Sequence, residues 1–351
     1  MLLYLHIPYC DSKCHYCSFN SYVDKFDTRQ SYMSAIVKHL EYEIKHFKVS
    51  KYSISTLFIG GGTPSTIDPE LYRPFFQMIN PYLVNGAEIT TEANPNSAND
   101  DWLRGMYALG VNRVSFGVQS FDADKLKALG RNHTAKQAIS SIYIAADIGF
   151  KHISLDLIYN YQNDSKELLD KDITQASKLP IDHISAYELT IEAHTPFTST
   201  PEVRQDNEEL AFFVAKSIEA LGLEQYEISN FGKYQSLHNK GYWELDNYIG
   251  IGAGAVGFLG DTRYYPQTDI ESYINNPLKI GPEKLSADEL LTEKIFLGLR
   301  SCIGVELDIL PVDMTKRAEI LIDEKKITLY DGKLYNQNYF LADEIALFLL
   351  S

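Results

Sequence analysis

Three of the four cysteines stand close together in "HIPYCDSKCHYCSF", residues 6–19. Their spacing is C-x3-C-x2-C, with thiols at Cys10, Cys14 and Cys17. In a reducing compartment, clustered thiols more often bind metals or carry out redox chemistry than form structural disulfides. Because the residues between them are polar, we expect an exposed loop that binds a metal group rather than three core thiols.

Two kinds of metal site compete at this loop. A structural zinc site closes with four ligands, and the chain has no second pair of cysteines or histidines at zinc-binding spacing. His15 lies inside the loop, where it would complete a zinc site only awkwardly, and Cys302 is expected to be a buried core thiol. An iron-sulfur cluster fits better, because three cysteines on four irons leave one iron open to an external ligand.

Strand patterns alternate with helical patterns along most of the chain. Short apolar runs predict strands at residues 2–7, 55–60, 88–93, 112–118, 152–159, 183–190 and 223–229. Helical periodicity falls between them at residues 33–47, 69–79, 99–109, 122–148, 165–178 and 206–221. This alternation predicts an α/β protein with a complete or partial TIM-like β/α barrel, and a doubly wound open sheet is the alternative. The cysteine loop follows the first strand, where a barrel places its active-site loops.

The regular alternation of strand and helix patterns ends in the last third of the sequence. We expect a β/α-barrel core over residues 1–230 and an irregular extension over residues 231–285. A helix followed by short strand-like pieces predicts a small C-terminal α+β domain over residues 286–351.

The charge balance excludes some classes of partner. Asp and Glu outnumber Lys and Arg by 47 to 32, which gives a formal net charge of -15. Non-specific binding to nucleic acid depends on neutralising phosphates, so we expect no nucleic-acid partner. The apolar first residues are too short for a signal peptide, and no apolar run is long enough to span a membrane. The expected location is therefore the cytoplasm.

Polar residues and glycines gather where the predicted strands end. The run "GGGTPS", residues 60–65, follows the strand at 55–60 and, taken alone, indicates a tight turn. Four polar residues lie at or soon after other strand ends: Glu92, Gln119, Arg131 and Asp156. Each alone is typical of a solvated loop, but together they could bind the amino, hydroxyl and carboxylate groups of one ligand.

The segment "LYLHIPYCDSKCHYCSF", residues 3–19, resembles the cluster loop of the radical S-adenosylmethionine (SAM) superfamily. Within that superfamily, the chain is similar from end to end to the HemN/HemW group of oxygen-independent coproporphyrinogen oxidases and heme chaperones. The resemblance implies a [4Fe-4S] cluster on Cys10, Cys14 and Cys17, with SAM on the open iron. Positions that match SAM-contacting positions of the family are Tyr4, Gly61, Gly62, Thr63, Glu92, Gln119, Arg131 and Asp156.

A second motif separates the members of this group. The oxidases carry a further cysteine where this chain has Phe19, whereas "HNKGYW", residues 238–243, resembles the HNxxYW signature of the heme chaperones. His238 would then offer an imidazole to heme, with Tyr242 and Trp243 as aromatic surface. The resemblance implies a heme chaperone; the alternatives are an oxygen-independent coproporphyrinogen III oxidase and another radical SAM enzyme such as a methyltransferase.

The same resemblance implies the partners and marks two departures. Expected partners are heme, heme-acceptor proteins such as respiratory hemoproteins, and an electron donor, with a homodimer left open. Asn160 and His194 stand in loops where family members commonly have glycine. These departures bear on the substrate side of the barrel more than on the cluster.

Overall fold

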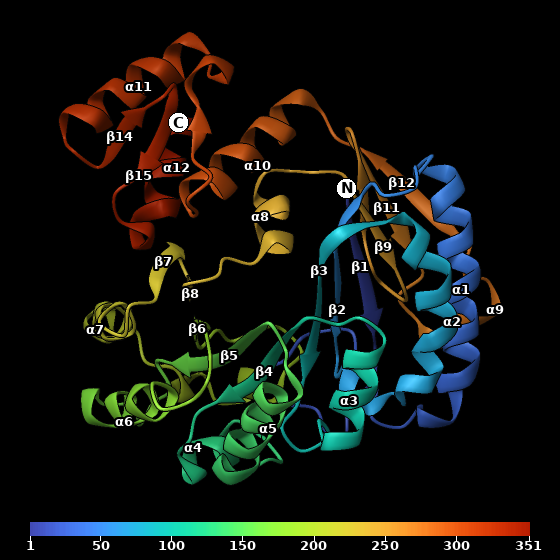
Figure 1. Ribbon diagram of the computed structural model, residues 1–351. Helices are drawn as coiled ribbons and strands as arrows, with labels where there is room; N and C mark the ends of the chain where they lie inside the picture. The colour runs from blue at the N-terminus through green and yellow to red at the C-terminus, as the bar shows by residue number, and fades with distance from the viewer.

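The computed structural model describes residues 1–351 and is built around one large sheet (Figure 1). Its strand order is β12-β11-β10-β9-β1-β2-β3-β4-β5-β6-β8-β7. Strands β9 and β1 to β6 form a parallel block, and the others join antiparallel. The first six strands are β1 (Leu2–Ile7), β2 (Ile54–Gly61), β3 (Leu83–Ala93), β4 (Arg113–Gln119), β5 (His152–Tyr159) and β6 (His183–Glu188).

Helices connect the parallel strands, as the sequence predicted. They are α1 (Arg29–His46), α2 (Pro69–Ile79), α3 (Asp100–Ala108), α4 (Ala123–Ala128), α5 (Ala135–Ile148), α6 (Lys166–Ala176) and α7 (Glu208–Glu219). The stretch expected as one helix at 122–148 is interrupted after α4, and Thr134 starts α5 with a capping box to Gln137. Since β12 and β7 end the strand order without pairing to each other, the sheet is open and forms a partial β/α barrel.

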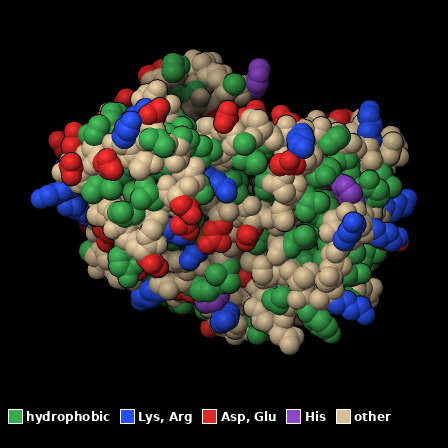
Figure 2. All heavy atoms as spheres, turned by 90° about the horizontal axis from the view of Figure 1, so that it is seen from above, with side chains coloured by type: hydrophobic (Ala, Val, Ile, Leu, Met, Phe, Trp, Pro, Cys, Tyr) green, Lys and Arg blue, Asp and Glu red, His purple; other side chains and the backbone are tan.

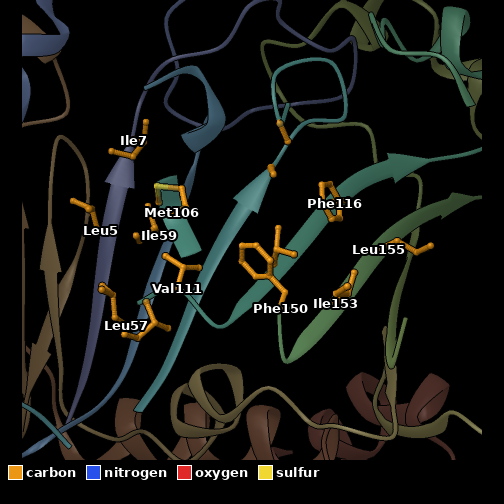
Figure 3. Close-up of a cluster of buried hydrophobic side chains, with 14 of the residues drawn as sticks. Leu5, Ile7, Leu57, Ile59, Met106, Val111, Phe116, Phe150, Ile153 and Leu155 are labelled. Carbon is orange, nitrogen blue, oxygen red and sulfur yellow. The ribbon is translucent and has the colours of Figure 1, made fainter. Parts of the chain in front are cut away.

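The two faces of the parallel strands differ in chemistry. Leu57, Phe116 and Leu155 lie on the face that packs against the helices, within a large buried cluster (Figure 3). Because strand side chains alternate between faces, the neighbouring positions point inward. These inner positions are largely polar or aromatic and include Tyr4, Thr56, Phe58, Glu88, Thr90, Glu92, Arg113, Ser115 and Asp156. The core therefore lies between sheet and helices, and the inner face is left for a polar site.

Residues 231–285 are more regular than the sequence predicted. They contain α8 (Leu237–Trp243), β9 (Tyr248–Ile251), β10 (Gly257–Leu259), β11 (Thr262–Pro266), α9 (Ile270–Asn275) and β12 (Ile280–Lys284). Strand β9 pairs in parallel with β1, and β10 to β12 extend that edge. These strands are short, so their alternation is too brief to identify from sequence. The strand predicted at 223–229 becomes a hairpin of β7 (Glu224–Glu227) and β8 (Asn230–Gly232), antiparallel to the parallel block.

The last residues form a unit with its own core beside α8 and β7 (Figure 1). It contains α10 (Ala287–Leu299), β13 (Val305–Glu306), α11 (Val312–Asp323), β14 (Ile327–Tyr330), β15 (Lys333–Asn336) and α12 (Ala342–Leu350). Its three strands make a separate sheet in the order β13-β15-β14. The three-part division of the chain at residues 230 and 285 stays a prediction.

Asn160 and His194, which stand where related proteins are expected to have glycine, both have a left-handed backbone conformation. The φ angles are 64° at Asn160 and 63° at His194. Asparagine tolerates this region better than most residues, whereas the exposed His194 is an unusual choice. At both positions the backbone thus has a conformation that favours glycine.

The surface carries charges of both signs. On the face seen in Figure 2, Lys and Arg side chains are scattered among Asp and Glu. None of the helices combines the length and the apolar composition that crossing a bilayer would need.

Candidate functional site

The cysteine loop follows β1, and two side chains from other loops contact its sulfur atoms. Thr63 Oγ1 lies 3.3 Å from Cys10 Sγ, and Arg131 Nη1 lies 3.3 Å from Cys14 Sγ. The backbone N–H of Cys17 donates to the carbonyl of Cys14. Burial raises the pKa of the Cys10 and Cys17 thiols. Donors such as Thr63 and Arg131 favour the thiolate form that a metal requires.

The residues considered as a fourth ligand are engaged elsewhere. His15 Nδ1 lies 2.9 Å from the carbonyl oxygen of Ala128, and its ring packs against Gly130. Cys302 is half-buried rather than fully buried as predicted, and its backbone N–H donates to Tyr226 near α8 and β7. No three His, Cys, Asp or Glu side chains form a single-ion site. Neither His15 nor Cys302 is therefore placed as a fourth zinc ligand of the loop, and the three thiols agree with the cluster that the sequence predicts.

The glycine run after β2 lies directly against the cysteine loop. Gly61 has a φ of +112°, and a Cβ there would lie 2.4 Å from His6 Nδ1. A Cβ at Gly62 would lie 2.8 Å from the carbonyl oxygen of Tyr9. Any side chain at these positions would displace β1 or the loop after it. The glycines are thus required by close backbone approach, and their N–H groups donate to Glu92 and to the carbonyl of Ile7.

Two half-buried carboxyl groups, Glu92 on β3 and Asp156 on β5, lie on the inner face. Glu92 Oε2 accepts a hydrogen bond from the Gly61 N–H at 3.1 Å, and Asp156 accepts one from Ser115 at 3.3 Å. Burial, together with the charge of Asp156, raises the pKa of Glu92 to about 8. Burial likewise raises the pKa of Asp156 to about 6 and holds that of Tyr4 well above its usual value. Perturbed carboxyl groups in one space are typical of a ligand site.

Arg131 connects this space to the cysteine loop. Its Nη2 donates to Asn94 Oδ1 and to the Gly117 carbonyl, both at 2.6 Å. Gln119 Nε2 also lies beside Gly117. A Cβ atom added to Gly117 would lie 3.1 Å from this nitrogen. Asn94 also lies 3.4 Å from Thr63 Oγ1, so it links two predicted site residues. Asn94 is not among the predicted site residues, although its place directly after the strand that carries Glu92 could have identified it.

The "HNKGYW" segment forms most of the short helix α8. His238 is fully buried, with its ring stacked on Phe58 at 5.2 Å and edge-on to Tyr242 at 4.6 Å between centroids. Its Nδ1 bonds Thr56, and its Nε2 has no partner. Burial lowers the pKa of His238 to about 3, so the ring is neutral, the form that binds metals. Trp243 lies beside this group and contacts Tyr226 at 5.7 Å.

Helix α8 covers the opposite end of the barrel from the cysteine loop. The Glu88 carboxylate accepts hydrogen bonds from the N–H groups of Leu237 at 2.9 Å and His238 at 3.0 Å, which fixes the start of α8. Thr56 pairs with Leu2 at the beginning of β1, whereas the cysteine loop begins after Ile7. At ~3.3 Å per residue, the two ends are separated by roughly 17 Å. The structure thus brings Thr63 and Arg131 to the cysteines and places His238 at the other end of the strands, with Tyr4 and Phe58 between the two ends.

Comparison with known proteins identifies the same family as the residues do. The model of the radical SAM superfamily matches residues 4–173. The heme chaperone HemW of Bacillus subtilis is 35% identical over 319 residues, covering 86% of this chain and 84% of that protein. HemW of Lactococcus lactis is 31% identical, covering 95% and 90%. HemW of Escherichia coli is 38% identical over 263 residues, covering 73% and 69%.

A solved structure supports the architecture. The radical SAM enzyme coproporphyrinogen III oxidase (HemN) of Escherichia coli superposes with a TM-score of 0.82 and covers 99% of this chain and 89% of that one. The identity is 17%, so this likeness shows the shared fold alone. The sequence relatives decide the finer assignment: the chain belongs to the HemW family within the radical SAM superfamily.

Proposed function

We propose that this protein is a heme chaperone that binds heme, passes it to acceptor proteins and carries a SAM-ligated [4Fe-4S] cluster. The observation that carries the proposal is His238, a neutral imidazole set between two aromatic rings with an unpartnered Nε2. An imidazole with a free nitrogen in apolar surroundings is the usual ligand of heme iron. The relatives named heme chaperones support the same function.

Cys10, Cys14 and Cys17 would hold the cluster, and their surroundings fit it. Thr63 and Arg131 donate to the sulfur atoms of Cys10 and Cys14. Hydrogen bonds of this kind stabilise thiolates and tune the potential of an iron-sulfur cluster. When bound, the cluster and SAM together supply one-electron chemistry.

The SAM site would consist of residues from four loops and strand ends. The proposed members are Tyr4, Gly61, Gly62, Thr63, Glu92, Gln119, Arg131 and Asp156. With a pKa of about 8, Glu92 holds a proton at neutral pH in the absence of a ligand. A cationic amino group placed beside Glu92 and Asp156 would draw both into the charged form, which makes the pair suited to the methionine amino group.

The remaining partners are part of the same proposal. Use of the cluster requires an electron donor, and delivery of heme requires acceptor proteins, for which respiratory hemoproteins are candidates. The proposed compartment is the cytoplasm, where the free thiols stay reduced. A homodimer is the proposed assembly.

An anaerobic assay on reconstituted protein tests this function against the oxidase alternative. Hemin is titrated into the protein, and coproporphyrinogen III turnover is followed separately with SAM and a reductant. We expect saturable hemin binding and no conversion to protoporphyrinogen. Phe19 is 60% exposed where the oxidases carry a cysteine, which disfavours their chemistry here. Turnover without saturable hemin binding would replace the chaperone by the oxidase.

A further inference from the structure

One buried cation on the inner face has no partner. Arg113, the first residue of β4, is only 2% exposed. Its Nε has no hydrogen-bond partner, and no ion pair joins its guanidinium to an acid. A buried charge without a partner is costly, so such groups are normally paired or hydrogen-bonded. An arginine in this state has no directly bonded anion and can accept one.

Two further unpartnered polar atoms lie beside it. Strand register places Phe58, Thr90 and Arg113 in one row across β2, β3 and β4. Thr90 Oγ1 is buried without a partner, and so is Nε2 of His238, whose ring stacks on Phe58. We call Thr90, Arg113 and His238 the barrel floor. The charge of Arg113 helps to lower the pKa of His238, which agrees with their closeness.

The acids around the barrel floor form no direct ion pair with Arg113, although its charge acts to lower the pKa of Glu92 and of Asp156. Both oxygens of Glu88 accept hydrogen bonds from α8 and the segment before it. Glu92 holds its proton at neutral pH because burial raises its pKa to about 8. Asp156 bonds Ser115 and makes no ion pair with Arg113. Tyr4, Phe58 and Tyr242 on the same side of the sheet are only half-buried, so the side chains around the floor are not completely enclosed.

We propose that the barrel floor binds a carboxylate, with Arg113 as its charged partner. Arginine binds carboxylates through two parallel hydrogen bonds, and the Thr90 hydroxyl offers a further donor. The inference rests on the proposed function, because heme carries two propionates and His238 belongs to the same floor. A propionate held by Arg113 would orient the porphyrin toward His238. The carboxylate of SAM is the other source of this chemistry, and the experiment separates the two.

The test compares ligands with and without their carboxylates in the reconstituted full chain. Hemin is compared with its dimethyl ester, and SAM with decarboxylated SAM. We expect wild-type protein to prefer hemin over the ester by about 10- to 100-fold, the range of a charge-assisted contact. Arg113→Gln should abolish most of this preference and Arg113→Lys should keep part of it. Arg73→Gln, which removes an exposed arginine on α2, is the matched control and should bind like wild type.

Each outcome bears on the proposal. If Arg113→Gln no longer prefers hemin over its dimethyl ester, the floor binds a propionate of heme. If it instead no longer prefers SAM over decarboxylated SAM, the floor binds the carboxylate of SAM. If folded Arg113→Gln protein keeps both preferences, bound water solvates the guanidinium and the proposal is wrong. Circular dichroism and iron content establish folding, and Arg113→Lys serves if Arg113→Gln does not fold. If wild type binds no hemin, the proposed function fails, while the SAM comparison still decides the carboxylate site.

Discussion

The Nδ1 atom of His238 lies 2.7 Å from Oγ1 of Thr56, a contact that joins helix α8 to the beginning of strand β2. It fixes the ring between Phe58 and Tyr242 and leaves Nε2 as the nitrogen that can bind a ligand. Since the side chain is fully buried, heme iron can reach this nitrogen only if α8 shifts. The hydrogen bonds of Glu88, Thr56 and Tyr226 to α8 and its N-cap oppose that shift.

We expect His238→Ala to weaken hemin binding substantially and to shift or broaden the Soret band. The reason is loss of an iron-imidazole bond, which is strong and geometry-specific. Hemin titration and iron content are measured on the same samples, and iron content should not change because the cysteine loop lies at the other end of the barrel. The ring also packs in the core, so thermal unfolding of the apo variant gives the packing effect separately. Identical affinity and spectra would remove His238 from the heme site.

The cysteines should divide into three that hold the cluster and one that does not. Alanine at Cys10, Cys14 or Cys17 should lower iron and sulfide after anaerobic reconstitution to near background. Cys302→Ala should reconstitute normally, because Cys302 lies beside Tyr226 and α8. Iron and sulfide analysis with the visible absorption spectrum checks both statements. A Cys302 variant without a cluster, its loop thiols intact, would refute the assignment.

Addition of SAM should change the electron paramagnetic resonance signal of the reduced cluster. The physical reason is direct ligation of the open iron. Arg131→Met should lower cluster content or SAM affinity, because Arg131 connects Cys14 to Asn94 and Gly117. Arg73→Met is the exposed control and should behave like wild type. A signal that stays the same at saturating SAM contradicts direct ligation.

The half-buried Glu92 should make the free energy of unfolding depend on pH in a predictable direction. Its pKa rises from 4.5 to about 8 on folding, so the folded state binds the proton more tightly than the unfolded state. The free energy of unfolding of the apo protein should therefore fall as pH rises from 4.5 to about 8. Glu92→Gln cannot ionise, so its stability relative to wild type should increase through this window and level off above it.

Urea unfolding at several pH values between 4.5 and 9 measures this effect. Glu70→Gln, which removes an exposed carboxylate on α2, should leave the slope unchanged because its partner Arg73 is also exposed. If the free energy of unfolding changes with pH in the same way in wild type and in Glu92→Gln, Glu92 ionises normally in the folded protein.

Local sequence patterns were enough to predict the β/α units of the barrel. They did not predict where β9 and α8 lie relative to those units. The strand at 55–60 and the helix at 69–79 follow from periodicity within a few residues, and β2 and α2 confirm them. The pairing of β9 with β1 joins residues far apart in sequence, and four residues of β9 are too few to carry a pattern. The α8 motif was visible, but nothing local says which end of the barrel it covers.

The candidate site shows the same division. Strand-end positions and the family resemblance together selected Glu92, Arg131 and Asp156, and their role in binding SAM stays a prediction. Glu92 lies near the end of β3, whereas Asp156 lies inside β5. Arg113 was overlooked since an arginine at the start of a strand usually faces water. Its burial depends on strands on both sides and on α8 below them, which are tertiary features.

The position of β1 also has a consequence for synthesis on the ribosome. Although it is the first strand to emerge, β1 lies inside the sheet, with β2 on one side and β9 on the other. Its β9 side therefore stays open in the nascent chain until residues near Tyr248–Ile251 have been made. An open parallel edge is a template for wrong pairing. Premature termination before β9 should thus yield an aggregating product rather than a smaller working barrel.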